Sequence, residues 1–216
     1  MTPVGLGFRA LRGGSVVVAI ASGASHREPR LVLSSFVATA IEGDRLSLEP
    51  YHVAVEMALG PDGRATGEAA ALVVEGRRRQ ADAAARGMDA LIAKLRQLEC
   101  EPVIAALLVN RAGWMTDLLA YSIAFPDHPP VAEGLAVRDA LRSAFDQVGL
   151  ERAELDEKVL PERASQDLGM SSSELDAALK VLGATAGRPW RKEQKLASLA
   201  AWVTITSREQ RAPPSA

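Results

Sequence analysis

A run of β-branched and small apolar residues near the amino terminus, Ser15 to Ala21 (SVVVAIA), restricts the fold of this chain more than any other feature. Such residues favour extended backbone, and a run with little polar alternation predicts a strand buried on both faces of a sheet. Val4 to Leu11 precedes it across a Gly13-Gly14 turn, and Leu31 to Ile41 follows a turn-rich stretch. Three strands joined by short turns predict an antiparallel meander.

Helical and apolar segments alternate through the rest of the chain. The stretch from Gly67 to Glu99 is rich in Ala, Leu and Arg and predicts a long helix, after a shorter one over Tyr51 to Leu59. Val103 to Val109 (VIAALLV) predicts a core strand. The later predicted elements are a helix over Val131–Val148, a short strand over Lys158–Leu160, and helices over Pro161–Leu168, Ser172–Leu182 and Arg191–Ile205.

This order of elements predicts an α/β fold. A strand, a helix and a further strand imply parallel pairing with a right-handed crossover. The prediction is therefore a mixed five-stranded sheet, with three antiparallel strands followed by two parallel ones, and helices on its faces. A length of 216 residues favours one domain, over residues 1–206, with a flexible tail over 207–216.

Composition and charge exclude several classes of protein. A hydrophobic content of 48% is too high for a disordered chain, and a net charge of −2 argues against coating nucleic acid by bulk positive charge. The single cysteine, Cys100, excludes a disulfide framework and a cysteine-rich zinc site. No apolar stretch reaches 18 residues and the first residues do not form a secretory signal, so we expect a cytoplasmic protein without membrane contact. No cofactor-binding motif is present, and we expect no cofactor.

The order of elements also resembles the ribonuclease H-like fold. The opening Val4 to Ala10 (VGLGFRA), with the turn and strand that follow, is similar to the first hairpin of RuvC-like resolvases. The segment from Lys192 to Ile205 is similar to their closing helix. The chain further resembles an uncharacterised bacterial family that shares the GFRA opening and a closing PW-x4-K-x6-W pattern, which here is Pro189-Trp190, Lys195 and Trp202.

The resemblance implies a set of metal-binding acids that this sequence does not supply. Nucleases of this group carry an aspartate in the first strand, an acid at the end of the fourth strand and acids on the closing helix, and these carboxylates hold two divalent metals. Here the first strand offers Arg9, the fourth strand ends in Val109-Asn110-Arg111, and the closing helix offers Glu193 between Lys192 and Lys195. We therefore expect no metal site and a catalytically degenerate domain.

The cations at these positions suggest binding instead of cleavage. If the closing helix packs near the first strand, Arg9, Lys192 and Lys195 converge, and a cluster of cations suits a phosphate group. Nucleic acid or a phosphorylated ligand is then the expected partner. The competing interpretation is that all three are solvated surface residues, the usual state of lysine and arginine.

Two alternatives remain open from the sequence. In the first, the protein is an enzyme with relocated acid and base groups: His128 and Glu133 flank a proline-rich break before a helix, and Glu56 follows His52 at helical i, i+4 spacing. The helix dipole alone also explains an acid such as Glu133 in a first turn. In the second, the chain is a structural or interaction module, such as a homodimer that uses Trp114 or Tyr121.

Overall fold

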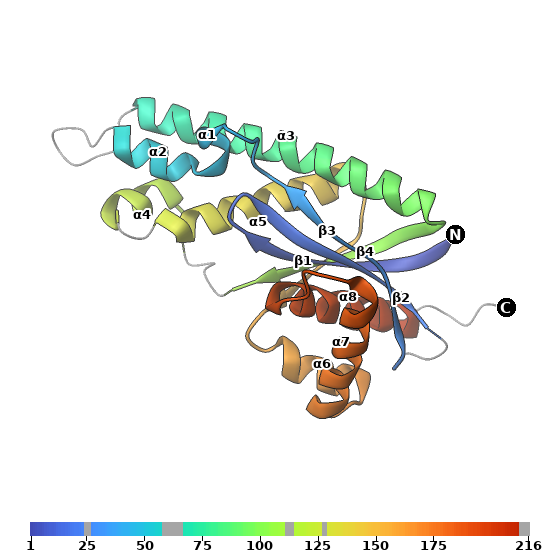
Figure 1. The fold of residues 1–216 in the computed structure, drawn as a ribbon. Coiled ribbons are helices and arrows are strands. Elements are labelled where there is room, and N and C mark those ends of the chain that lie inside the picture. The colour runs from blue at the N-terminus through green and yellow to red at the C-terminus, as the bar shows by residue number, and fades with distance from the viewer. Residues whose placement is uncertain (24–26, 58–66, 111–114, 127–128, 212–216) are drawn as a thin grey trace.

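The computed structural model describes residues 1–23, 27–57, 67–110, 115–126 and 129–211. They form a twisted sheet covered by helices on both faces (Figure 1). The sheet has five strands in the order β3-β2-β1-β4-β5. β1, β2 and β3 pair antiparallel, while β4 lies parallel to β1 and β5 lies parallel to β4. The predicted mixed sheet is confirmed. The strands are β1 (Thr2–Leu11), β2 (Gly14–Ser22), β3 (Pro29–Ala38), β4 (Cys100–Val109) and β5 (Arg152–Asp156).

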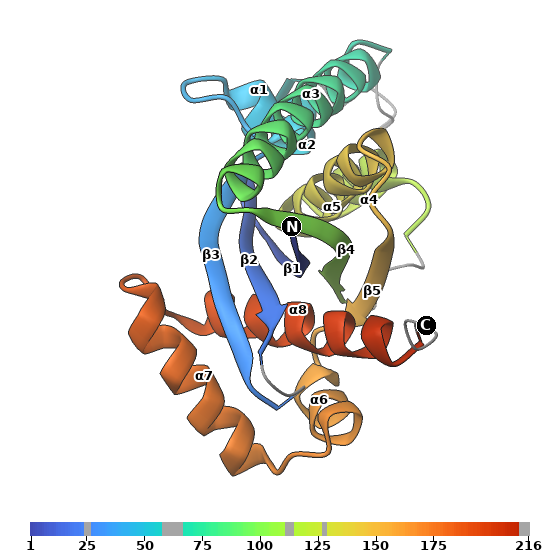
Figure 2. The ribbon, with the colours of Figure 1, turned by 90° about the vertical axis from the view of Figure 1, so that its right-hand side faces the viewer.

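The helices divide into two groups by the face of the sheet that they cover, as Figure 2 shows. One face carries α1 (Arg45–Leu48), α2 (Pro50–Met57), α3 (Gly67–Gln97), α4 (Leu118–Ala124) and α5 (Pro129–Gln147). The other face carries α6 (Leu160–Leu168), α7 (Ser172–Ala186) and α8 (Lys192–Arg211). Of the described helices, none combines the length and apolar character that a membrane span requires.

Strand β1 separates two hydrophobic cores because its side chains alternate between the faces. Val4, Leu6 and Phe8 are buried among residues of α3 and α5. On the opposite face, a Cβ added at Gly7 would lie 1.9 Å from the carbonyl oxygen of Ala197 in α8. Glycine at this position therefore allows the helix backbone to lie directly against the strand.

Two predicted boundaries are wrong. Lys158–Leu160 is not a strand: Lys158 and Val159 lie in a turn and Leu160 begins α6, while the fifth strand lies earlier, over β5. This strand reads RAELD, and because it buries only Leu155 its apolar pattern is too short to recognise. The last helix passes the predicted end at Ile205 and continues to Arg211, so the first part of the expected tail is helical.

Candidate functional site

The carboxyl ends of the three parallel strands, β1, β4 and β5, meet at one edge of the sheet. The connections from β1 and β4 leave in opposite directions there, because β1 is followed by β2 on one side and β4 by β5 on the other. Crevices outside such a reversal point are the usual ligand sites of open α/β sheets. The charged groups at this edge are therefore the first candidates for a functional site.

Arg9 lies near the end of β1, on the face covered by α8, and binds two glutamates. Its Nε and Nη2 donate to the two carboxylate oxygens of Glu157 at 3.1 and 3.0 Å, and its Nη1 donates to Glu193 Oε1 at 3.3 Å. Glu157 directly follows β5 and Glu193 lies in the first turn of α8. The three side chains are only 18%, 23% and 28% exposed, so solvent screens these ion pairs only in part. We call this group the Arg9 cluster.

The Arg9 cluster does not fit the metal site that the resemblance implies. A two-metal site needs carboxylates from several elements with free oxygens directed at the ions. Here the guanidinium engages both oxygens of Glu157 and one of Glu193, and its charge repels a divalent cation. Within the described ranges, no three His, Cys, Asp or Glu side chains gather closely enough to hold a metal ion.

Lys192 and Lys195 project into a different environment from Arg9. Both line a groove of about 330 Å³ between α6, α7 and α8, together with Ser172 and Asp176 at the start of α7. In the described part of the chain, neither lysine forms an ion pair. Arg9 does not line this groove, but its partner Glu193 follows Lys192 directly in α8. All three predicted cations thus lie at the amino-terminal end of α8, Arg9 through its contact with Glu193, but they do not line the same pocket.

Glu133 is buried in the first part of α5 and holds the start of α2. Its Oε1 accepts hydrogen bonds from the backbone N–H groups of Tyr51 and His52, both at 2.9 Å. Burial raises the pKa of Glu133 to about 7, although these two N–H groups oppose the shift. Its Oε2 is buried and has no hydrogen-bond partner among the described residues. Glu133 therefore carries a proton part of the time at neutral pH.

Of the other predicted catalytic residues, Glu56 is engaged by an arginine on the surface of α2. Glu56 is 48% exposed on α2, where both of its oxygens accept from Arg45 at 2.7 Å. These hydrogen bonds from Arg45 hold the pKa of Glu56 below its ordinary value. The imidazole Nε2 of His52 lies 3.6 Å from Glu56 Oε1. His128 lies outside the described residues, so its relation to Glu133 stays a prediction.

Glu133 lines a cavity of about 640 Å³ that the sequence does not reveal. The cavity lies between the start of α5, the ends of β1 and β4, and the α1–α2 region; its lining includes Arg12, Glu49, His52, Asn110 and Arg138. Arg138 is the functional candidate that sequence reasoning missed. It interrupts an apolar i, i+3 series between Leu135 and Leu141. A single arginine on the apolar face of a predicted helix indicates a buried cation, and this pattern is visible in the sequence.

The aromatic residues proposed for a dimer have mixed environments. Tyr121 on α4 is half-buried, and its ring centroid lies 5.1 Å from that of Phe125. Phe125 is itself 51% exposed. Trp114 lies outside the described residues, and a homodimer stays a prediction.

Comparisons with known proteins bear on the fold. The chain is similar to the solved structure of RuvC from Thermus thermophilus, at 12% identity and a TM-score of 0.49, over 97% of this chain and 96% of that one. It is also similar to T. thermophilus RuvC in complex with a Holliday junction substrate, at 11% identity and a TM-score of 0.50, over 98% and 96% of the two chains. No protein-family model and no curated protein matches the sequence.

The fold is ribonuclease H-like, of the RuvC type. The resemblance drawn from the sequence is confirmed for the fold, and the match covers nearly the whole chain. Identity this low carries the fold and not the activity, since one fold serves many functions.

Proposed function

We propose that this chain is a RuvC-like domain that binds a nucleic acid or a phosphorylated ligand without cleaving it. The observation that carries the proposal is the Arg9 cluster. The first strand supplies the guanidinium of Arg9 and no acid, and that guanidinium holds Glu157 and Glu193 in ion pairs. With these two carboxylates engaged and a cation between them, the described residues at this edge of the sheet do not supply the donor set that two-metal cleavage requires.

Lys192 and Lys195 are the proposed contacts to phosphate. Both lie on the first turn of α8 and face a groove, and neither is paired with an acid among the described residues. Unpaired lysines supply the salt-dependent part of nucleic-acid binding by displacing counterions from the phosphates. The complex of RuvC with a Holliday junction supports nucleic acid as the partner, since it is a protein of the same fold bound to DNA.

The experiment is a titration of fluorescently labelled four-way DNA, duplex DNA, single-stranded DNA and RNA, followed by anisotropy at several salt concentrations. We expect affinity to fall as salt rises. The double variant Lys192→Gln/Lys195→Gln should bind more weakly and lose about 2 from the slope of log K against log salt, because each phosphate contact contributes about 0.9.

The matched control is Lys94→Gln, which changes an exposed lysine on α3, across the sheet from α8. This variant should leave both affinity and salt slope unchanged. The proposal is wrong if no phosphate-bearing ligand binds, or if binding does not depend on salt.

The alternative of an enzyme with relocated chemistry is tested on the same oligonucleotides. Cleavage that requires Mg²⁺ or Mn²⁺ would contradict the proposal directly. Cleavage without a metal that disappears in Glu133→Gln would support the alternative, because Gln preserves the contacts to Tyr51 and His52 but cannot exchange a proton.

A further inference from the structure

The cavity beside Glu133 holds a buried cation that forms no ion pair with an acid of the described residues. Arg138 is 9% exposed. Its Nε donates to the carbonyl oxygen of Leu108 at 3.1 Å, and its Nη1 donates to that of Gly134 at 3.0 Å. Both acceptors are neutral backbone groups, and no carboxylate within the described ranges lies at ion-pair distance from Arg138. Arginine keeps its charge even when buried, so the site holds a full positive charge.

The two acids whose charges act on the pKa of Arg138, Glu157 and Glu154, are already engaged by other arginines. Glu157 binds Arg9 through both of its oxygens. Glu154 binds Arg142 in the same two-point manner, at 2.7 and 3.1 Å. Because a buried charge without a partner is costly, such a group is usually either compensated or functional. In Arg138, Nη2 forms no hydrogen bond to a described residue, so the guanidinium can still donate to a ligand.

A second polar group of the same cavity is also buried and incompletely satisfied. Glu133 is 7% exposed, and its Oε2 lacks a partner within the part of the chain that the structure describes. Two further charges in the lining, Arg12 and Glu49, pair with each other. Part of the remaining wall is apolar, formed by Leu11, Val131 and Leu135. A mostly apolar pocket with a few convergent polar groups is the usual form of a small-molecule site.

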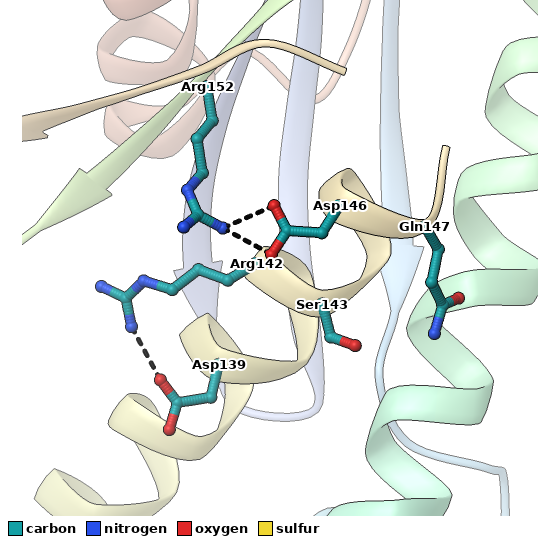
Figure 3. A pocket seen from close by; sticks show the side chains of 6 residues that line it. All are labelled: Asp139, Arg142, Ser143, Asp146, Gln147 and Arg152. Carbon is teal, nitrogen blue, oxygen red and sulfur yellow. Dashed lines mark hydrogen bonds and ion pairs between the residues drawn. The ribbon is translucent and has the colours of Figure 1, made fainter. Parts of the chain in front are cut away.

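A hollow on the outer surface of α5 provides a contrast. This hollow measures about 600 Å³, and most of the side chains that line it are charged. The charged side chains form ion pairs with one another and with Glu154, and Figure 3 shows two of these pairs. Arg152 donates to both oxygens of Asp146, and Arg142 donates to Asp139. Its arginines already have acidic partners. The cavity at Arg138 differs because its guanidinium lacks one.

We propose that this cavity binds a small organic monocarboxylate, with its carboxylate on Arg138 and its apolar body against Leu135 and Val131. The charge of the site decides between carboxylate and phosphate. Arg138 supplies one uncompensated positive charge, while Arg12 is neutralised by Glu49. A dianionic phosphate would leave one negative charge unmatched beside Glu133. This site is separate from the lysine groove and does not depend on the nucleic-acid proposal.

The test is NMR titration of the full chain with benzoate, phenyl phosphate and benzyl alcohol, at a pH between the second pKa of a phosphate monoester, about 6, and the pKa of Glu133, about 7. We expect benzoate to shift the amide signals of Tyr51 and His52, whose N–H groups bind Glu133. Phenyl phosphate should bind more weakly, and benzyl alcohol, which has no charge, should not bind. Arg138→Gln should weaken benzoate binding by about tenfold or more, because a charge-assisted hydrogen bond to the carboxylate is lost.

Two variants keep this test independent of any loss of folding. Leu135→Phe fills the cavity without changing a charge and should abolish benzoate binding, whereas Arg163→Gln, an exposed change on α6 across the sheet, should leave it unchanged. The proposal is overturned if benzoate does not bind, if it binds no better than benzyl alcohol, or if phenyl phosphate binds more tightly. Equal benzoate binding in the wild type and in Leu135→Phe would also overturn it.

Discussion

Two arginines flank the same pair of strands and differ in how their charges are neutralised. Arg9 on β1 lies opposite Leu108 on β4 in the sheet register, and Arg138 donates to the carbonyl oxygen of that same Leu108. Arg9 contacts two glutamates on the α8 face, whereas Arg138 on α5 contacts only neutral carbonyl groups. In the Arg9 cluster, Nε, Nη1 and Nη2 of Arg9 all donate to glutamates, and these contacts link β1 to the end of β5 and to α8. In the Arg138 cavity, Nη2 of the guanidinium forms no hydrogen bond to a described residue.

The two faces also differ in how closely helices approach the sheet. On the α8 face, Gly5 and Gly7 leave no room for a side chain against the helix backbone. On the α5 face, a cavity of about 640 Å³ remains at the strand ends. The backbone of α8 therefore lies directly on β1, whereas the start of α5 leaves space at the strand ends.

The largest expected effect separates these two faces. Gly7→Ala places a methyl group 1.9 Å from the Ala197 oxygen, so we expect the protein to lose about 4 kcal/mol or more of unfolding free energy or to fail to fold. The matched change on the other face is Gly134→Ala, whose added Cβ meets only Arg138 Nη1, at 3.5 Å. It should stabilise α5 by up to about 1 kcal/mol. Denaturant unfolding measures both, and equal effects would remove the contrast between the faces.

The next effect concerns pH and the cavity. Because the pKa of Glu133 is raised from 4.5 to about 7 by burial, the folded state holds a proton that the unfolded state releases. Its stabilising contribution is complete below pH 4.5 and is lost as pH rises to about 7, a change of about 3 kcal/mol. Glu133→Gln should remove this component of the pH dependence of unfolding. Identical pH profiles for the two proteins would show that the Glu133 site is not desolvated.

The two arginines themselves give a smaller effect. Arg9→Met leaves Glu157 and Glu193 partly buried without their cation and should cost about 1 to 3 kcal/mol of stability. Arg138→Met removes a buried charge that has no acidic partner, and because the lost desolvation cost offsets the lost hydrogen bonds it should cost less than about 1 kcal/mol. If thermal and denaturant unfolding show the larger loss for Arg138→Met, that arginine is structural and the comparison fails.

The smallest effect is expected at Glu56. Its ion pair with Arg45 lies on the exposed surface of α2. Surface pairs of this kind add little to stability, so Glu56→Gln should change neither the unfolding midpoint nor ligand binding measurably. A loss of ligand binding in this variant would return Glu56 to the functional site.

The sequence predicts the sheet well because burial on both faces leaves a strong signal in β2, whose first eight residues are all buried. It misplaces β5 because Leu155 is the only side chain that this strand buries. With the strand predicted at Lys158–Leu160, Glu157 would precede a strand instead of following one. The sequence therefore does not place Glu157, which accepts two hydrogen bonds from Arg9, at the carboxyl edge of the sheet.

The candidate site is predicted in part for a similar reason. Arg9 and Glu193 were recognisable because the resemblance drew attention to β1 and the closing helix. The Arg138 cavity arises where α5, α2 and two strand ends meet, and no local pattern encodes such a meeting of distant segments. The only local trace is an arginine inside an apolar series.

The central claim is that a RuvC-like domain with Arg9 in its first strand binds nucleic acid and leaves it intact. The most direct measurement is to incubate labelled four-way DNA with the protein and Mn²⁺, at a protein concentration where anisotropy reports a bound complex, and to separate the strands by denaturing electrophoresis. We predict that the DNA is bound and every strand keeps its full length. Shortened strands that appear only with Mn²⁺ would contradict the account, and the absence of a bound complex would contradict its nucleic-acid form.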